Sequence, residues 1–157
     1  LFMGTEIAQI NQWYCNESLH WDLLKEPLHQ MAQLYVKDLN MLYLSHAAFY
    51  ENDFDRMSFE WVINNDAKGG ILVYLRHAKE KSILCFHHFM DKEKKNYSCK
   101  APKARGKFKR ITKLFSSDEK KYGGKGISDA KIDPQKGEIS IDTSPFTTIV
   151  FEVEFEK

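Results

Sequence analysis

Paired carboxylates are the side chains in this 157-residue sequence that could support acid–base or nucleophilic chemistry. The pairs are Asp53 with Asp55 and Asp118 with Glu119, and Glu6 follows a short apolar segment at the start. Two carboxyl groups held close together can act as nucleophile and general acid. Both pairs lie in segments typical of turns, where aspartate bonds to nearby backbone N–H groups. We therefore expect turn-forming residues and surface charges at these positions.

Aromatic rings are the second group of side chains that could bind a ligand. Most of them lie in segments with strand character, where rings either pack a core or form flat platforms for sugars or bases. Core packing is the commoner role. Trp13 and Trp21 lie in a long irregular segment, whereas Trp61 shares strand parity with Phe59, which fits a core position.

The three cysteines, Cys15, Cys85 and Cys99, do not predict a metal or disulfide site. Their number is odd, no Cys-x-x-Cys motif occurs, and Cys15 with His20 lacks a second ligand pair at zinc spacing. Cys85 lies inside an apolar strand and is expected to be a buried free thiol. The pattern favours a reducing compartment, and we expect neither a metal nor another cofactor.

Charge gives no general drive toward nucleic acid or membrane, because the formal net charge is only +1. The segment from Lys100 to Lys113 nevertheless carries seven cations and no acid. A solvated hairpin edge explains it, since edge strands use lysine to block unwanted pairing. An RNA-binding β-domain is a weaker alternative, because Phe108 alone is not a stacking platform. The sequence contains neither a run of about 20 apolar residues nor a secretion signal.

The first third of the sequence is expected to be helical and rich in loops. Residues 1 to 3 resemble the carboxyl end of a buried strand cut from something longer, and residues 9 to 26 have no regular period. Pro27 suits a first helical position, and apolar residues then recur at spacings of three and four. This pattern predicts an amphipathic helix from about 27 to 44, with a wide apolar stripe that packs against something substantial.

Beyond residue 54 the apolar period changes to two, which is typical of strands. We expect a strand around Phe59 to Ile63, and in the last strand Ile149, Phe151, Val153 and Phe155 should face inward. The other expected strands are Ile71 to Arg76, Ile83 to Phe89, Tyr97 to Lys100 paired with Lys107 to Phe115, and Glu138 to Ile141. Seven or eight short antiparallel strands with turn signals between them predict a mainly β fold, a β-sandwich.

Four stretches together resemble bacterial-type 1,4-α-glucan (glycogen) branching enzymes of the α-amylase superfamily. They are Phe2-Met3-Gly4-Thr5-Glu6 with Gln9, Trp13 and Ser18-Leu19-His20-Trp21; Asp38-Leu39-Asn40-Met41-Leu42-Tyr43; Asp53-Phe54-Asp55 with Phe59-Glu60-Trp61; and Ser116-Ser117-Asp118 with Tyr122-Gly123-Gly124-Lys125-Gly126. The resemblance spans nearly the whole chain in the right order. His20 stands where the family usually has aspartate, and His87-His88-Phe89 replaces a Cys-Asn-Phe or Ser-Asn-Phe segment, which indicates a diverged member.

The resemblance implies two parts. Residues 1–52 would be the end of a catalytic (β/α)8 barrel, with the end of strand eight, a loop and the last helix. Residues 53–157 would be the C-terminal all-β sandwich of the α-amylase type. Such an enzyme cleaves α-1,4-glucan chains and rejoins them as α-1,6 branches by a retaining mechanism. Its carboxylates come from several strands of a barrel of about 250 residues, so we expect no catalytic residue here and an inactive isolated chain.

The resemblance also suggests carbohydrate-binding candidates at Trp61, Trp13, Trp21, Glu6 and Gln9. Sugar rings present apolar C–H faces that stack on flat aromatic rings, so we hypothesise that Trp61 lies near a sheet edge within a surface glucan site. The alternative is a core tryptophan. Trp13 and Trp21 either border the glucan groove or anchor their loop. Glu6 either faces the active-site mouth or pairs with a nearby cation.

The implied partners are an α-glucan such as glycogen and the upstream barrel of the same enzyme, without nucleic acid or membrane, in the cytoplasm. A stand-alone glucan-binding or interaction module is the alternative function. Without the barrel, the apolar face of the helix needs another cover. It should then fold back on the sandwich or drive self-association.

Overall fold

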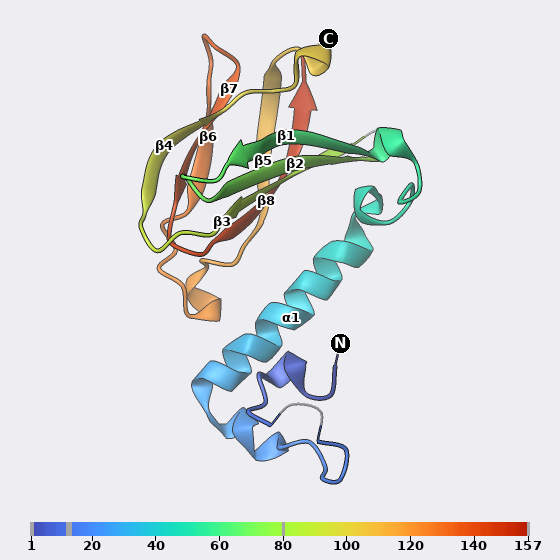
Figure 1. The fold of residues 1–157 in the computed structure, drawn as a ribbon, viewed down its shortest axis with the longest axis vertical. Coiled ribbons are helices and arrows are strands. Elements are labelled where there is room, and N and C mark those ends of the chain that lie inside the picture. The colour runs from blue at the N-terminus through green and yellow to red at the C-terminus, as the bar shows by residue number, and fades with distance from the viewer. Residues whose placement is uncertain (1, 12–13, 80, 157) are drawn as a thin grey trace.

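The structure, a computed structural model, describes residues 2–11, 14–79 and 81–156, so Leu1 and Trp13 lie outside the described residues. A helical N-terminal part leads into two β-sheets (Figure 1). Among the described residues, no helix is both long enough and apolar enough to cross a membrane. Within the same ranges, no group of three or more His, Cys, Asp or Glu side chains could hold a metal ion.

The predicted helix is confirmed as α1, which spans Pro27–Ser45 with Pro27 in its first turn. Short 3-10 segments, Thr5–Ile7 and Trp21–Lys25, pack around its start, and His29 Nδ1 donates to the Ile7 carbonyl oxygen at 2.8 Å. Phe2 and Met3 are exposed, lead into a turn and are not part of a strand in the described chain. The expected end of a barrel strand at residues 1 to 3 stays a prediction.

The described residues form eight antiparallel strands in two sheets. The five-stranded sheet has the order β1 (Phe59–Asp66), β2 (Ile71–His77), β3 (Ser82–His88), β8 (Thr148–Phe155), β5 (Phe108–Ser116). The three-stranded sheet has the order β4 (Lys94–Cys99), β7 (Glu138–Thr143), β6 (Asp129–Asp133). The predicted mainly β fold of two packed antiparallel sheets is therefore confirmed.

Two details of the strand prediction were wrong. The segments now seen as β4 and β5 were expected to pair, but β4 pairs with β7 and β5 pairs with β8. The chain between them crosses from one sheet to the other through Pro102 and the 3-10 turn Lys103–Arg105. The two strands therefore lie in different sheets and cannot form a hairpin. Strand β6 was not predicted, because its sequence Asp-Ala-Lys-Ile-Asp has only two apolar positions.

The main core lies between the two sheets and includes Val73, Phe86, Ile141 and Phe151. A second core covers the opposite face of the five-stranded sheet, which we call the outer face. It is built from Leu42, Ala48, Ile83, Cys85, Phe115 and Val150. Because β3 and β8 are covered on both faces, their buried residues form runs in place of a strict alternation.

Helix α1 covers part of the outer face, as expected for a helix that folds back on the sandwich. The Tyr35 ring lies 5.5 Å from the Phe115 ring, and Leu42 is buried in the second core. At the C-terminal end of the helix, Arg76 donates to the carbonyl oxygens of Ala48 (3.2 Å) and Phe49 (3.1 Å) and pairs with Asp53. These bonds tie the segment between α1 and β1 to the sheet.

Candidate functional site

Five rings cross the part of the outer face that α1 leaves open, and we call them the ring row. The row consists of Phe59 and Trp61 from β1, Tyr74 from β2, His87 from β3, and Phe89 directly after β3. Neighbouring ring centroids are 5.0 Å apart for Phe59–Trp61, 5.9 Å for Trp61–Tyr74, 5.4 Å for Tyr74–His87 and 6.0 Å for His87–Phe89. Phe59–Trp61 and His87–Phe89 are neighbours two residues apart along the chain, whereas Trp61–Tyr74 and Tyr74–His87 are cross-strand neighbours.

Trp61 is 47% exposed and lies on β1, an edge strand of the five-stranded sheet. Its indole meets the rings of Phe59 and Tyr74 edge-on, with interplanar angles of 88° and 85°. These contacts hold the ring in one orientation while half of its surface faces solvent. Trp61 is therefore not a core residue, although it shares strand parity with Phe59 and the sequence alone allowed a core position.

The ring row carries no formal charge. Burial lowers the pKa of His87 below its ordinary value, so its imidazole is neutral at pH 7, and its Nδ1 lies 2.9 Å from Thr148 Oγ1. Burial raises the pKa of Tyr74, which keeps its phenol protonated. A neutral, braced aromatic surface suits an uncharged ligand with apolar faces and hydroxyl groups.

The structure does not bring the other candidate residues to the ring row. Trp21 is 55% exposed in the segment Trp21–Lys25, and Glu6 is half-buried in Thr5–Ile7. Gln9 ties its own loop together, because its Oε1 accepts from the His20 backbone N–H (3.0 Å) and its Nε2 donates to the Asn11 carbonyl oxygen (2.8 Å). Figure 1 shows this N-terminal segment around the start of α1, at the opposite end of the helix from β1.

The paired acids form no open catalytic pair. Asp55 accepts the Met57 backbone N–H at 2.8 Å, as expected for a turn former, and Asp53 pairs with Arg76. Glu119 lies 3.4 Å from the Lys121 ammonium. The alternative of a paired Glu6 gains no support, because no ion pair joins it to another described residue.

Asp118 was expected to be a surface charge, and that expectation was wrong, because it is only 6% exposed. Its carboxylate accepts backbone N–H groups of Lys125 (2.9 Å), Ile127 (3.0 Å) and Ser128 (3.0 Å), and the Ser128 hydroxyl (2.8 Å). Burial alone would raise its pKa, but these hydrogen bonds outweigh burial and lower it. Asp118 therefore organises the glycine-rich loop from within.

Two of the sequence motifs meet in a clamp that was not predicted. Asp38 on α1 accepts the Lys121 ammonium (2.8 Å) and the Tyr122 hydroxyl (2.7 Å) from the glycine-rich loop. The bond from Lys121, followed by that from Tyr122, lowers the pKa of Asp38. Through the loop that Asp118 holds, the β-domain thus grips the middle of α1.

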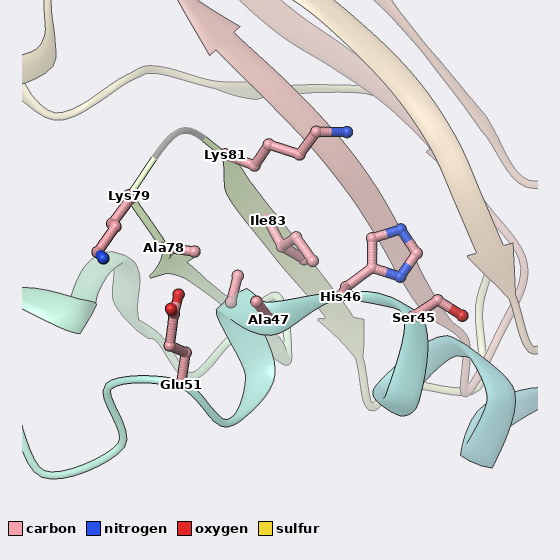
Figure 2. Close-up of a pocket in the computed structure, with 9 residues that line it drawn as sticks. Ser45, His46, Ala47, Glu51, Ala78, Lys79, Lys81 and Ile83 are labelled. Atoms are coloured by element: carbon pink, nitrogen blue, oxygen red, sulfur yellow. The ribbon is translucent and has the colours of Figure 1, made fainter.

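A hollow of about 380 Å³ lies between the end of α1 and the turn that joins β2 to β3 (Figure 2). His46 and Lys81 lie on one side of it, and Glu51 and Lys79 lie on the other. Lys81 pairs with Glu152 at 2.7 Å, and His46 Nδ1 donates to the Leu42 carbonyl oxygen at 2.9 Å. Because these groups are spread apart and two of them have partners, the hollow is a weaker candidate than the ring row.

Comparison with known proteins gives a consistent result. The family model described as "Alpha amylase, C-terminal all-beta domain" matches residues 61–154. The chain is 31% identical, over an alignment of 159 positions, to the 1,4-alpha-glucan branching enzyme GlgB of Protochlamydia amoebophila. This alignment covers 98% of the chain and 21% of that relative. It is 34% identical, over an alignment of 161 positions, to the 1,4-alpha-glucan branching enzyme GlgB 2 of Rhizobium johnstonii. That alignment covers 97% of the chain and 21% of the relative. The chain thus spans about a fifth of the length of the curated relatives it matches.

Solved structures show the same fold. An alpha-amylase from H. orenii superposes with a TM-score of 0.52 at 18% identity, covering 78% of this chain and 20% of that one. A trehalose-6-phosphate hydrolase of Bacillus licheniformis gives a TM-score of 0.51 at 17% identity, covering 83% and 19%. At these identities the likeness concerns the fold alone.

Proposed function

This chain belongs to the family of the alpha-amylase C-terminal all-beta domain, and on that premise we propose that it forms the C-terminal part of a 1,4-α-glucan branching enzyme. The support is that relatives with this name align over 95% or more of the chain. The whole enzyme would cut α-1,4-glucan chains and rejoin them as α-1,6 branches of glycogen. Residues 1–52 would close its catalytic barrel, and residues 53–157 would be its non-catalytic sandwich.

The role of the sandwich is to hold the last helix of the barrel and to bind glucan. The observation that carries glucan binding is Trp61, a half-exposed indole braced edge-on by Phe59 and Tyr74 on an edge strand. A fixed flat ring can stack on the C–H face of a glucose unit without first losing rotamer freedom. The rings themselves are uncharged and the neighbouring Arg76 is paired with Asp53, which suits a neutral polysaccharide.

Affinity electrophoresis through gels containing glycogen tests this role. Trp61→Ala should weaken glycogen retention by about tenfold, the loss expected for one stacked aromatic ring. Phe54→Ala is the matched control, because Phe54 is fully exposed but lies outside the ring row. Trp61→Phe, which keeps a flat ring, should retain most of the binding. Unchanged retention of a folded Trp61→Ala variant would remove Trp61 from the glucan site.

The barrel is the proposed partner of α1. Leu28, Leu39 and Leu44 are exposed on this helix, so part of its apolar surface is not covered by the sandwich. An apolar helix surface of this kind normally packs against another element. Without the barrel, the same surface would promote self-association, and sedimentation velocity should show a size that increases with concentration.

A stand-alone glucan-binding module is the second candidate function, and the ring row favours it equally. The two proposals differ in what covers α1. A module that acts alone would remain monomeric at high concentration, whereas a barrel fragment would not. We also propose a cytoplasmic location, because Cys15, Cys85 and Cys99 are all free thiols.

A further inference from the structure

The ring row continues well beyond Trp61. The rings of Tyr74, His87 and Phe89 follow one another with interplanar angles of 26° and 14°, so they are nearly parallel across β2 and β3. Phe89 is 56% exposed at the far end. Its backbone N–H donates to the Gly70 carbonyl oxygen at 2.8 Å, which fixes the residue directly after β3. The row therefore has an exposed ring at each end, Trp61 and Phe89, with half-buried Tyr74 and His87 between them and Phe59 packed against Trp61 and Tyr74.

The two central rings of the row are neutral and their polar atoms have protein partners. The Tyr74 hydroxyl is bonded to the buried Cys85 thiol, and His87 Nδ1 is bonded to Thr148 Oγ1. Neither ring is charged at neutral pH, so the row presents ring surfaces to a ligand and does not attract an anion. The exposed cations Lys109 and Arg110 lie on β5, at the opposite edge of the same sheet from β1. Arg76 lies beside Phe59 and Tyr74, but its guanidinium is paired with Asp53 and bonded to the carbonyl oxygens of Ala48 and Phe49. The charge next to the ring row is therefore compensated, which matches a neutral chain better than nucleic acid or an acidic peptide.

We propose that Phe89 is a second glucan-stacking residue, so that the ring row binds an α-1,4-glucan along its length from Trp61 to Phe89. This inference rests on the proposed glucan binding at Trp61 and adds a requirement for chain length. A short oligosaccharide can cover Trp61 alone. A longer chain reaches both exposed rings, and the second contact then forms within a complex that already exists.

Calorimetric titration of the 157-residue chain with maltotriose and with maltoheptaose tests the proposal. Phe89→Ala should weaken maltoheptaose binding by about tenfold, which corresponds to about 1.4 kcal/mol, and should leave maltotriose binding unchanged. Trp61→Ala should weaken the binding of both sugars. Phe89→Tyr should restore the wild-type affinity, because it returns a flat ring. Phe146→Ala is the control, since Phe146 is an exposed phenylalanine outside the ring row.

Each outcome has one meaning. If Phe89→Ala binds maltoheptaose as tightly as wild type while Trp61→Ala binds it weakly, the site ends at Trp61, and only the proposed role of Phe89 is overturned. If neither substitution changes binding, the glucan surface itself is refuted. If Phe146→Ala weakens binding as much as Phe89→Ala, the effect is a general loss of apolar surface, which also overturns the proposal. Thermal melting of each variant confirms that it is folded.

Discussion

Replacing Asp118 by alanine should destabilise the β-domain by about 3 kcal/mol. The carboxylate accepts four hydrogen bonds at 2.8 to 3.0 Å, and a bond to a charged group contributes roughly 1.5 to 3 kcal/mol. The loss should be smaller than the sum of the four bonds. Lys125 and Ile127 are exposed, so water can replace the carboxylate as partner of their N–H groups. Ser128 is buried, and its two donors would lose their partner without replacement.

Urea unfolding followed by circular dichroism measures this loss, and thermal melting should show a decrease of about 6 to 12 °C. Asp133→Ala is the matched control. Asp133 also accepts two backbone N–H groups, of Gln135 (2.9 Å) and Lys136 (3.1 Å), but these lie in an exposed turn. Its loss should be clearly smaller. If Asp118→Ala unfolds at the same urea concentration as Asp133→Ala, the buried carboxylate does not organise the loop as described.

The difference between wild type and Asp118→Ala should also depend on pH. Hydrogen bonds hold the pKa of Asp118 in the folded protein below its ordinary value of about 4. A carboxyl whose pKa is lowered by folding stabilises the protein fully above the unfolded pKa and loses that contribution as pH falls through the folded pKa. The stability difference should therefore be constant near neutral pH and shrink below about pH 4. A constant difference down to pH 2 would contradict the ionised state assigned here.

Three further predictions follow from the same structure. Tyr122→Phe should cost about 1 kcal/mol in urea unfolding, because the clamp loses one hydrogen bond to Asp38 while Lys121 keeps the other; no change would mean that the hydroxyl does not support the clamp. Gly124→Ala should cost about 2 kcal/mol or more, since its Cβ would lie 2.1 Å from the Asp118 carbonyl oxygen; wild-type stability would exclude this close approach. Iodoacetamide at pH 8 should modify only exposed Cys15 in the folded chain. Burial raises the pKa of Cys85 to about 11 and of Cys99 to about 12, and only thiolates react; three adducts before unfolding would contradict it.

Much of the fold could be predicted because local periodicity decides it. The spacing of three and four from Leu28 to Leu42 predicted α1, and the alternation after Ile149 predicted β8. Periodicity says nothing about which strands pair. The pairing of β4 with β7 depends on the chain crossing between sheets near Pro102, so the expected pair with β5 was wrong.

The candidate site was predicted less completely, for a reason that concerns three-dimensional placement. Parity showed that Trp61 and Phe59 share a face, but only strand order decides that β1 is an edge and that Trp61 is exposed. Phe89 joins the row through His87, two residues before it, and only the pairing of β3 with β2 brings His87 onto Tyr74. Asp118 was misjudged because its turn motif is typical of surfaces, whereas the glycine-rich loop folds over it. An aspartate followed within eight residues by several glycines is a sequence signal that could have revealed this, because such a loop can fold over the carboxylate.

We propose that this chain binds glucan and carries no catalytic centre for branching. The α-1,6 linkage content of amylose after incubation with the 157-residue chain tests the catalytic part most directly, and NMR spectroscopy of the sugar anomeric protons measures it. We predict no increase over amylose incubated alone, because the required carboxylates belong to barrel strands that this chain does not provide. A rise in α-1,6 linkages with purified chain would contradict the account.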